Sequence, residues 1–415
     1  MPDTQGYFET GRQLVSGDYS DYTGKRTPVY PLLIAAAGYN QYVVAGLQSA
    51  MGVGIAILLY LIFARLSGHD SYGLILGLTY TLNPSQILIE STLVSETTCT
   101  FILLFSVFYL FKILAKAAPP GEKDIAWLGF LCGLCILTRP QYQPLPLLII
   151  FFLAYCFHSL SLSKIWKYIF LLIPVLLMLI PWAFFQYKRI GQFVLSPDLG
   201  YDMTNHTVKF IEAAPERYAD LKEILIENRT VKLRTRHDTY NCVATSIPEM
   251  LKLRGYKYSD LCKELGEMNF AVIRLEPLLY LNSVLRSFVT FFKPTWYGRL
   301  FGIRSAVTSG GFILKTIALV YASFHLCCML VFLTVPVFKL LKTRWTAFFT
   351  WTSELSFIYL LVLTTGISQA FVECGENARY KTSVEPLVIC VACWILIKFA
   401  TVFFSRNKKP AFIGQ

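Results

Sequence analysis

The chain has 415 residues, of which 55% are hydrophobic and only 15% are charged, and its formal net charge is +12 at pH 7. A soluble chain of this length needs more polar surface, so the composition excludes a soluble globular protein and indicates a membrane protein with several spans. The basic residues fall mostly between hydrophobic segments, which argues against a nucleic-acid-binding stripe.

Residues 1–41 are predicted as an acidic, aromatic loop with a juxtamembrane helix. The loop carries Asp3, Tyr7, Asp18 and Arg26. A partly desolvated carboxylate beside the membrane can accept the proton of a hydroxyl nucleophile, which makes Asp3 a candidate general base. The alternative is that Asp3 frays with the chain terminus. Asp18 follows a glycine and is more typical of a turn.

About nine hydrophobic segments are long enough, or nearly so, to cross a hydrocarbon core of roughly 30 Å. They are residues 42–65, 71–89, 95–116, 125–138, 142–158, 166–185, 314–341, 345–371 and 384–404. The chain then divides into a bundle of about six spans (42–185), an outer helical domain with an interfacial helix (186–313), a bundle of about three spans (314–404) and a cytoplasmic tail (405–415).

The orientation follows from the basic residues, which gather in alternate loops, at Arg65, Lys116, Lys167, Lys342 and Lys409. Such a bias marks the cytoplasmic side. It predicts that residues 1–41, 186–313 and 372–383 lie on the outer face, with the C-terminus inside.

The long outer segment has the spacing of amphipathic helices. Pro248 suits the first turn of one helix, and Ser259 is able to cap another. The stretch 278–296 mixes large apolar residues with Arg286 and Lys293 and is typical of a helix at the membrane interface.

Three further residues are candidates for chemistry. Glu96 begins the third segment among hydroxyl residues. Burying a charged carboxylate at this depth costs free energy unless it is paired with a cation or takes part in the function. Arg139, before Pro140, and Arg379, before Tyr380, can each hold two phosphate oxygens at once. The alternatives are a helix-start acid stabilised by the dipole for Glu96 and interfacial anchors for the arginines.

Four motifs together resemble the polyprenyl-phosphate-sugar glycosyltransferases of the GT-C superfamily, which include protein O-mannosyltransferases and lipid A aminoarabinose transferases. The motifs are Asp3 and Tyr7 with Gly17-Asp18 and Arg26 to Leu32, Leu93 to Glu96, Gly133 to Pro140, and Gly375 to Tyr380 followed by Pro386. The resemblance implies an all-α GT-C-like bundle that moves a sugar from a polyprenyl-phosphate donor to an acceptor hydroxyl, with inversion.

The same resemblance implies the role of each residue. Asp3 is then the catalytic base, with Glu96 beside it, and Arg379, Arg139 and Tyr380 bind the donor phosphate. Asp18, Arg26 and Tyr7 are accessory. The enzyme would lie in the plasma (inner) membrane with its active site on the outer face, and its acceptor would be a glycan, a lipid or a protein.

Two other functions stay open: a flippase or other transporter of lipid-linked sugars, and a polymerase or ligase that uses lipid-pyrophosphate glycans. Transporters place ionisable groups near the middle of the bilayer, whereas here they gather near the outer loops.

We expect no cofactor, although the sequence leaves a divalent metal open. Cys132 and Cys135 lie on an apolar segment without a second pair, which argues against a metal site. Cys242, Cys262 and Cys374 lie outside the spans and would allow one disulfide.

The family places a span directly before the catalytic loop, whereas here the matching aspartate is the third residue. The resemblance therefore predicts one further span upstream, giving ten. We expect Asp3 to be loosely held where that span is missing.

Overall fold

The computed structural model describes residues 2–116, 118–157, 162–236, 239, 241–293, 311–340, 352–375 and 377–407. All regular secondary structure of these residues is helical, in agreement with the predicted all-α class. The helices are α1 (Pro2–Ser16), α2 (Val29–Ala36), α3 (Gln41–Ser67), α4 (Asp70–Thr81), α5 (Pro84–Ser91), α6 (Glu96–Leu114), α7 (Glu122–Thr138), η1 (Pro140–Tyr142), α8 (Leu145–Cys156), α9 (Leu162–Ile169), α10 (Leu172–Ile190), α11 (Leu199–Thr207), η2 (Val208–Ala213), η3 (Glu216–Tyr218), α12 (Ala219–Arg236), α13 (Cys242–Arg254), α14 (Tyr258–Leu275), α15 (Pro277–Phe291), α18 (Gly311–Leu340), α19 (Ser353–Val372), α20 (Asn377–Tyr380), η5 (Lys381–Ser383) and α21 (Glu385–Asn407).

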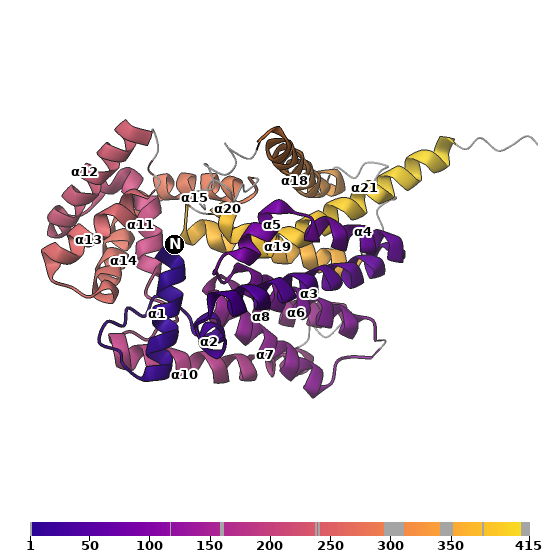
Figure 1. The fold of residues 1–415 in the computed structure, drawn as a ribbon, viewed down its shortest axis with the longest axis horizontal. Helices are drawn as coiled ribbons and strands as arrows, with labels where there is room; N and C mark the ends of the chain where they lie inside the picture. The colour runs from indigo at the N-terminus through magenta and orange to yellow at the C-terminus, as the bar shows by residue number, and fades with distance from the viewer. Residues whose placement is uncertain are drawn as a thin grey trace, which may run out of the picture.

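Four helices of the described residues are long and apolar enough to cross a membrane: α3, α6, the segment Trp166–Ile190 that contains α10, and α19. A fifth candidate combines Asn377–Ser383 with Glu385–Thr401, two helical segments that meet at a bend of 72°. Helices α3, α6, α7 and α10 run in similar directions, and α11 to α14 lie at one end of this bundle (Figure 1). The described residues therefore have the architecture of an integral membrane protein, with four or five candidate spans among them.

The nine-span count stays a prediction. The expected span 71–89 is divided between α4 and α5, because Asn83 and Pro84 begin a new helix there and the Asn83 side chain accepts from Ser85 N. Helices α7 and α8 have 17 and 12 residues and are short for a span. Lys342, Lys409, residues 341–351 and the end of the predicted tail, residues 408–415, lie outside the described residues.

The N-terminal stretch is more helical than predicted. Asp3, Tyr7 and Thr10 recur at spacings of four and three residues and so share one face of α1, where Tyr7 and Thr10 are buried. Asp3 lies in the first turn, where the helix dipole favours an acid. The prediction of a loop before residue 17 is therefore wrong, and α1 crosses the direction of α10 in Figure 1.

Helix α7 is held against α10 by close backbone contact. A Cβ added at Gly129 would lie 2.3 Å from Leu171 O, and one at Gly133 would lie 2.6 Å from Met178 Sδ. Small residues allow two helices to approach this closely. The contact fixes the end of α7, after which Arg139 follows.

Helices α11 to α14 form a domain with an apolar core of its own, which we call the outer domain after its predicted position (Figure 1). A buried amide ties two of these helices together, because Asn269 Oδ1 accepts from Thr207 Oγ1 at 2.6 Å and Asn269 Nδ2 donates to Gly200 O at 2.7 Å. A Cβ at Gly200 would lie 1.9 Å from Cys262 O, so α11 and α14 touch through their backbones.

Two predicted helix starts in this domain are wrong. Pro248 lies inside α13, which begins at Cys242, and Ser259 lies inside α14, whose N-cap is Lys257. Cys242 and Ser246 are buried in the domain, so packing extends α13 past the proline in spite of its low helix propensity. Ser259 is itself buried and caps nothing.

Helix α15 covers most of the predicted interfacial stretch 278–296 and starts with a proline at its first position. Ser283, Ser287 and Phe291 are buried on the face that packs on α19 and α20. The last residues of the stretch, from 294, lie outside the described residues.

Candidate functional site

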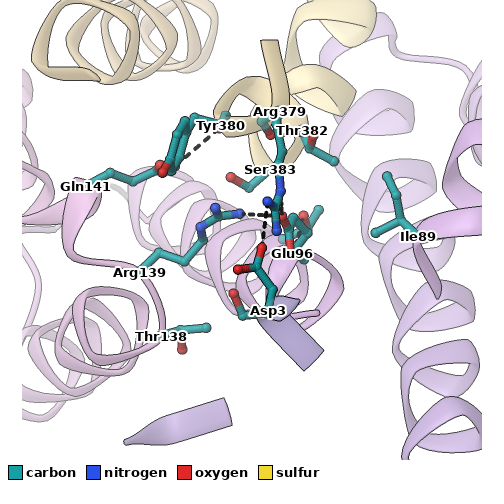
Figure 2. A network of polar contacts seen from close by, with 12 residues as sticks. Asp3, Ile89, Glu96, Thr138, Arg139, Gln141, Arg379, Tyr380, Thr382 and Ser383 are labelled. Carbon is teal, nitrogen blue, oxygen red and sulfur yellow. Dashed lines mark hydrogen bonds and ion pairs between the residues drawn. The ribbon is translucent and has the colours of Figure 1, made fainter. Parts of the chain in front are cut away.

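Four charged side chains from four elements converge at the end of the bundle nearest the outer domain. Asp3 lies in α1, Glu96 begins α6, Arg139 follows α7, and Arg379 lies in α20. Figure 2 shows both arginine side chains pointing toward the two carboxylates. The sequence separation within this cluster reaches 376 residues, between Asp3 and Arg379, so only the tertiary fold assembles it.

Glu96 is the most deeply buried member, with a relative exposure of 1%. Its Oε1 lies 2.6 Å from Arg379 Nε and 3.3 Å from Arg139 NH1. Two guanidiniums therefore balance one carboxylate that would be very costly to bury alone. The interfacial-anchor alternative for the two arginines does not describe these contacts, since both side chains turn inward.

Asp3 bridges Arg379, which also contacts Glu96, and a third guanidinium, that of Arg26. Its Oδ1 lies 2.5 Å from Arg26 NH2 and its Oδ2 lies 2.8 Å from Arg379 NH1. Asp3 is thus firmly held, contrary to the expectation of a loosely held residue. Burial alone would raise the pKa of the Asp3 carboxyl, but the charges of Arg26 and Arg379 and their hydrogen bonds outweigh burial and hold the pKa far below its usual range.

The cluster carries a net positive charge. Three guanidiniums (Arg26, Arg139 and Arg379) contact two carboxylates (Asp3 and Glu96). One excess positive charge in a partly buried position favours an anionic group nearby.

The turns that carry Arg139 and Arg379 are fastened to each other. The Arg139 guanidinium lies 5.0 Å from the centroid of the Tyr380 ring, a cation–π contact. Gln141 Nε2 donates to Tyr380 O at 3.3 Å, and the hydroxyls of Tyr142 and Ser383 hydrogen-bond to each other. The sequence motifs do not single out Gln141, Tyr142 or Ser383, although the first two directly follow Arg139 and Pro140.

Tyr7 and Arg26 join the cluster, as the resemblance implies for accessory residues. The Arg26 guanidinium lies 4.5 Å from the Tyr7 ring centroid, and the Tyr7 hydroxyl hydrogen-bonds to Ser95 Oγ at 2.9 Å. Asp18 does not join it. Asp18 is exposed, follows Gly17 with a φ of 76°, and accepts from Ser20 N at 3.1 Å, so its predicted turn role is the one the structure has.

A cavity of about 1430 Å³ lies between this cluster and the outer domain. Tyr7, Arg26, Arg139 and Tyr380 line its inner part, while apolar residues of α10 line one side. Arg139 NH1 lies at the ion-pair distance from Glu96 given above but forms no hydrogen bond to it, and Gln141 Oε1 also lacks a hydrogen-bond partner among the described residues. The cavity therefore reaches buried polar atoms that a ligand could satisfy.

A second buried charge cluster lies at the bend before α21. Glu385 Oε1 lies 2.7 Å from His325 Nδ1 and 3.1 Å from Lys381 Nζ, and Lys381 has an exposure of 0%. Lys381 Nζ also donates to Lys293 O at 2.9 Å. The spacing of four residues between Lys381 and Glu385 was a signal for this pair. Lys381 is thus occupied away from the Arg379 cluster.

The cysteines named above are free thiols, so Cys242, Cys262 and Cys374 form no disulfide. Cys132 and Cys135 are buried in the core of the bundle, as expected for small apolar residues. Across the described ranges, no group of three or more His, Cys, Asp or Glu side chains is placed to hold a metal ion.

Comparison with protein-family models, with curated proteins and with solved structures finds no match for the chain.

Proposed function

We propose that the protein is a membrane glycosyltransferase of the GT-C type, which transfers a sugar from a polyprenyl-phosphate donor to an acceptor hydroxyl at the outer face of the membrane with inversion at the sugar carbon. The observation that carries this proposal is the Asp3 carboxylate between Arg26 and Arg379, in a cluster with excess positive charge beside a large cavity. A base and a phosphate-binding group are the two parts that this reaction needs.

In the proposed reaction, the acceptor oxygen attacks the anomeric carbon as the bond from that carbon to the phosphate oxygen breaks. The acceptor proton passes to Asp3, and the phosphate leaves with the bonding electrons. Arg139 and Arg379 stabilise the charge that develops on the leaving phosphate. Glu96 holds both guanidiniums in position from behind, since its Oε1 contacts both.

Asp3 in two ion pairs is a weak base, because its pKa is lowered. A bound donor phosphate would compete for the Arg379 guanidinium and weaken its attraction for Asp3. The carboxylate would then become more basic at the time when the donor is in place. This coupling would limit proton uptake by Asp3 in the absence of substrate.

The transporter alternative would draw on the buried cluster of His325, Lys381 and Glu385, since buried ionisable groups mark many transport pathways. The cavity next to His325 has a volume of only about 10 Å³, which leaves no room for a sugar. The large cavity lies instead beside the Asp3 cluster, which favours the transferase.

The proposal is tested with the purified full chain in nanodiscs, given radiolabelled polyprenyl-phosphate sugars together with glycan, lipid and protein fractions as acceptors. We expect label in a product and release of polyprenyl phosphate, both lost in Asp3→Asn. Transfer only from lipid-pyrophosphate glycans would show the polymerase or ligase instead. Movement of a lipid-linked sugar across proteoliposomes without transfer would show the transporter.

A further inference from the structure

Helix α14 presents a charged and aromatic face to the large cavity. Lys263, Glu267, Phe270 and Arg274 follow one another at spacings of three and four residues and therefore share one face. All four are exposed and line the cavity, and Phe270 has an exposure of 61%. The opposite face of α14 is buried in the core of the outer domain, so the helix is fixed with this polar face toward the cavity.

Basic side chains outnumber acidic ones on the cavity wall. The charged lining residues are Lys25, Arg26, Arg139, Arg217, Lys263 and Arg274 on the basic side and Asp198, Asp202 and Glu267 on the acidic side. Arg26 and Arg139 are engaged with Asp3 and Glu96. The outer part of the cavity then has four basic groups against three acids.

The charged form of one of these acids, Asp202, is disfavoured. Burial, together with the negative charges of Glu373 and Asp198, raises the pKa of the Asp202 carboxyl well above its usual range. Glu373 accepts from Asn205 Nδ2 at 2.9 Å and from Cys374 N at 3.0 Å. Basic groups therefore outnumber the acids of the outer wall, and the raised pKa of Asp202 adds to this imbalance.

Several of the wall cations rest against aromatic rings. Lys25 Nζ lies 5.4 Å from the Tyr201 ring centroid and 5.1 Å from that of Tyr258, and the Arg274 guanidinium lies 6.0 Å from that of Phe270. Cation–π contacts hold these groups without neutralising their charge. Their field can act on an anionic ligand in the cavity.

The residue next to Lys25 reaches the Asp3 cluster directly. Lys25 precedes Arg26, whose guanidinium contacts Asp3, and consecutive Cα atoms lie about 3.8 Å apart. This short loop is fixed, because Ser196 Oγ donates to Lys25 O at 3.0 Å and Gln186 Nε2 donates to Gly24 O at 2.8 Å. A ligand held at Lys25 would therefore lie close to the proposed base.

We propose that Lys25 and the cavity-facing residues of α14 form a binding wall for an acidic glycan, a chain of sugar rings that carry carboxylates or similar anionic groups. The inference deepens the proposed function and rests on it in one respect, since it names this glycan as the acceptor class. The binding itself stands on the charge and geometry of the wall.

A soluble glycan suits this wall better than an anionic lipid headgroup does. Helix α14 belongs to the outer domain and is not among the candidate spans (Figure 1). The exposed rings of Phe193 and Phe270 line the same cavity as the charges. Apolar faces with a few placed polar groups match sugar rings, whose C–H faces and hydroxyls alternate.

The test measures binding to the full chain in phosphatidylcholine nanodiscs without donor. The probes are a fluorescent oligogalacturonate, a maltooligosaccharide of equal length, and vesicles that contain phosphatidylglycerol. At low salt we expect the acidic oligosaccharide to bind about tenfold or more tightly than the neutral one. The difference should shrink at about 1 M salt, where charges are screened beyond about 3 Å.

Variants locate the site. Lys263→Glu with Arg274→Glu should weaken oligogalacturonate binding about tenfold or more, whereas Glu267→Lys should strengthen it. Lys252→Glu is the matched control, because Lys252 is exposed on the outer domain but does not line the cavity. The affinity of this variant for oligogalacturonate should equal that of the unsubstituted chain.

Equal binding of the neutral and acidic oligosaccharides, or binding of anionic vesicles alone, would overturn the inference. So would an unchanged affinity in both charge variants. These outcomes are distinct from failure of the proposed function, since an active transferase with a neutral acceptor would defeat only the inference. Normal binding of the acidic glycan without any sugar transfer would contradict the proposed glycosyltransferase function and support the proposed binding wall.

Discussion

At the scale of single residues, Asp3 is firmly positioned for the proposed proton transfer, but its lowered pKa makes it a weak base. Its ion pairs with Arg26 and Arg379 place it with precision, and the same pairs lower its pKa. A base of low pKa stays deprotonated but accepts a proton reluctantly. The proposed mechanism resolves this through the donor phosphate, which shares Arg379.

The first prediction concerns this carboxylate. Asp3→Asn keeps the size of the side chain and removes the proton acceptor, so we expect transfer to fall by roughly 10²-fold or more. The measurement is the rate of label transfer by protein that elutes as a single species. Asp18→Asn is the control and should leave the rate nearly unchanged, because Asp18 lies in an exposed turn. A full rate in Asp3→Asn would remove Asp3 from the mechanism.

The second prediction concerns pH. Because the folded-state pKa of Asp3 is lowered, the group stays ionised above that value and becomes protonated only as pH falls through it. We expect kcat/KM to be retained on the acid side down to about pH 4, the ordinary range of a carboxyl group, before Asp3 limits it. An acid limb centred near neutral pH and lost in Asp3→Asn would contradict the lowered pKa.

The third prediction concerns Arg379, which uses Nε for Glu96 and NH1 for Asp3 at once. A lysine ammonium is a point charge and cannot span both carboxylates, so Arg379→Lys should be about as inactive as Arg379→Ala. Arg65→Lys is the control, since Arg65 makes one exposed ion pair, with Glu354 at 3.2 Å. Substantial activity in Arg379→Lys would show that charge alone suffices.

The residues of the cluster could be proposed from the sequence, whereas their contacts could not. Short motifs around Asp3, Glu96, Arg139 and Arg379 pointed to these positions, and an acid or arginine at the edge of an apolar segment needs a partner. Which partner each one takes depends on how α1, α6, α7 and α20 pack. The sequence therefore predicts only an accessory role for Arg26, whereas in the structure its guanidinium contacts Asp3 directly.

At the scale of elements, the most informative pair is η1 with η5. Each of these short helices lies beside an arginine of the site, and each breaks the regular course of a longer helix. The hydroxyl pair of Tyr142 and Ser383 is buried and joins them. It sets the spacing of Arg139 and Arg379 without touching either guanidinium.

The fourth prediction therefore concerns this pair. Tyr142→Phe or Ser383→Ala leaves a buried hydroxyl without its partner and should cost about 1–3 kcal/mol of stability. The double variant should cost less than the sum of the two, because no hydroxyl is left unpaired. Thermal unfolding of the detergent-solubilised protein measures this. An additive double variant would show that the two hydroxyls do not interact.

Elements were predicted well where hydrophobicity runs long and poorly where tertiary packing decides. The uninterrupted segments of α3, α6 and α19 are easily seen as spans. The polar and aromatic composition of α1 predicts a loop, whereas the spacing of its buried residues Tyr7 and Thr10 indicates a helix. The start of α13 could not be found, since packing carries that helix through Pro248.

At the scale of the whole molecule, the site, the cavity and the outer domain lie at one end of the spans, and the first turn of α7, which contains Lys123, lies past the other end of α6. Helix α6 has 19 residues, which at 1.5 Å per residue is about 28 Å and close to the thickness of a hydrocarbon core. It begins at Glu96 in the site. The side of the membrane that each region faces can therefore be tested without knowing the total number of spans.

The last prediction is that Lys252 and Lys123 face opposite sides of the membrane, with Lys252 outside. Both side chains are exposed, and one candidate span, α6, separates the site from Lys123 in the first turn of α7. In intact cells, a membrane-impermeant maleimide should label Lys252→Cys, while Lys123→Cys should react only after the membrane is permeabilised. The unsubstituted chain controls for its own thiols. Labelling of both positions in intact cells would contradict α6 as a span, and labelling of Lys123→Cys alone would place the site on the cytoplasmic face, where a polyprenyl-phosphate transferase of the proposed kind does not act.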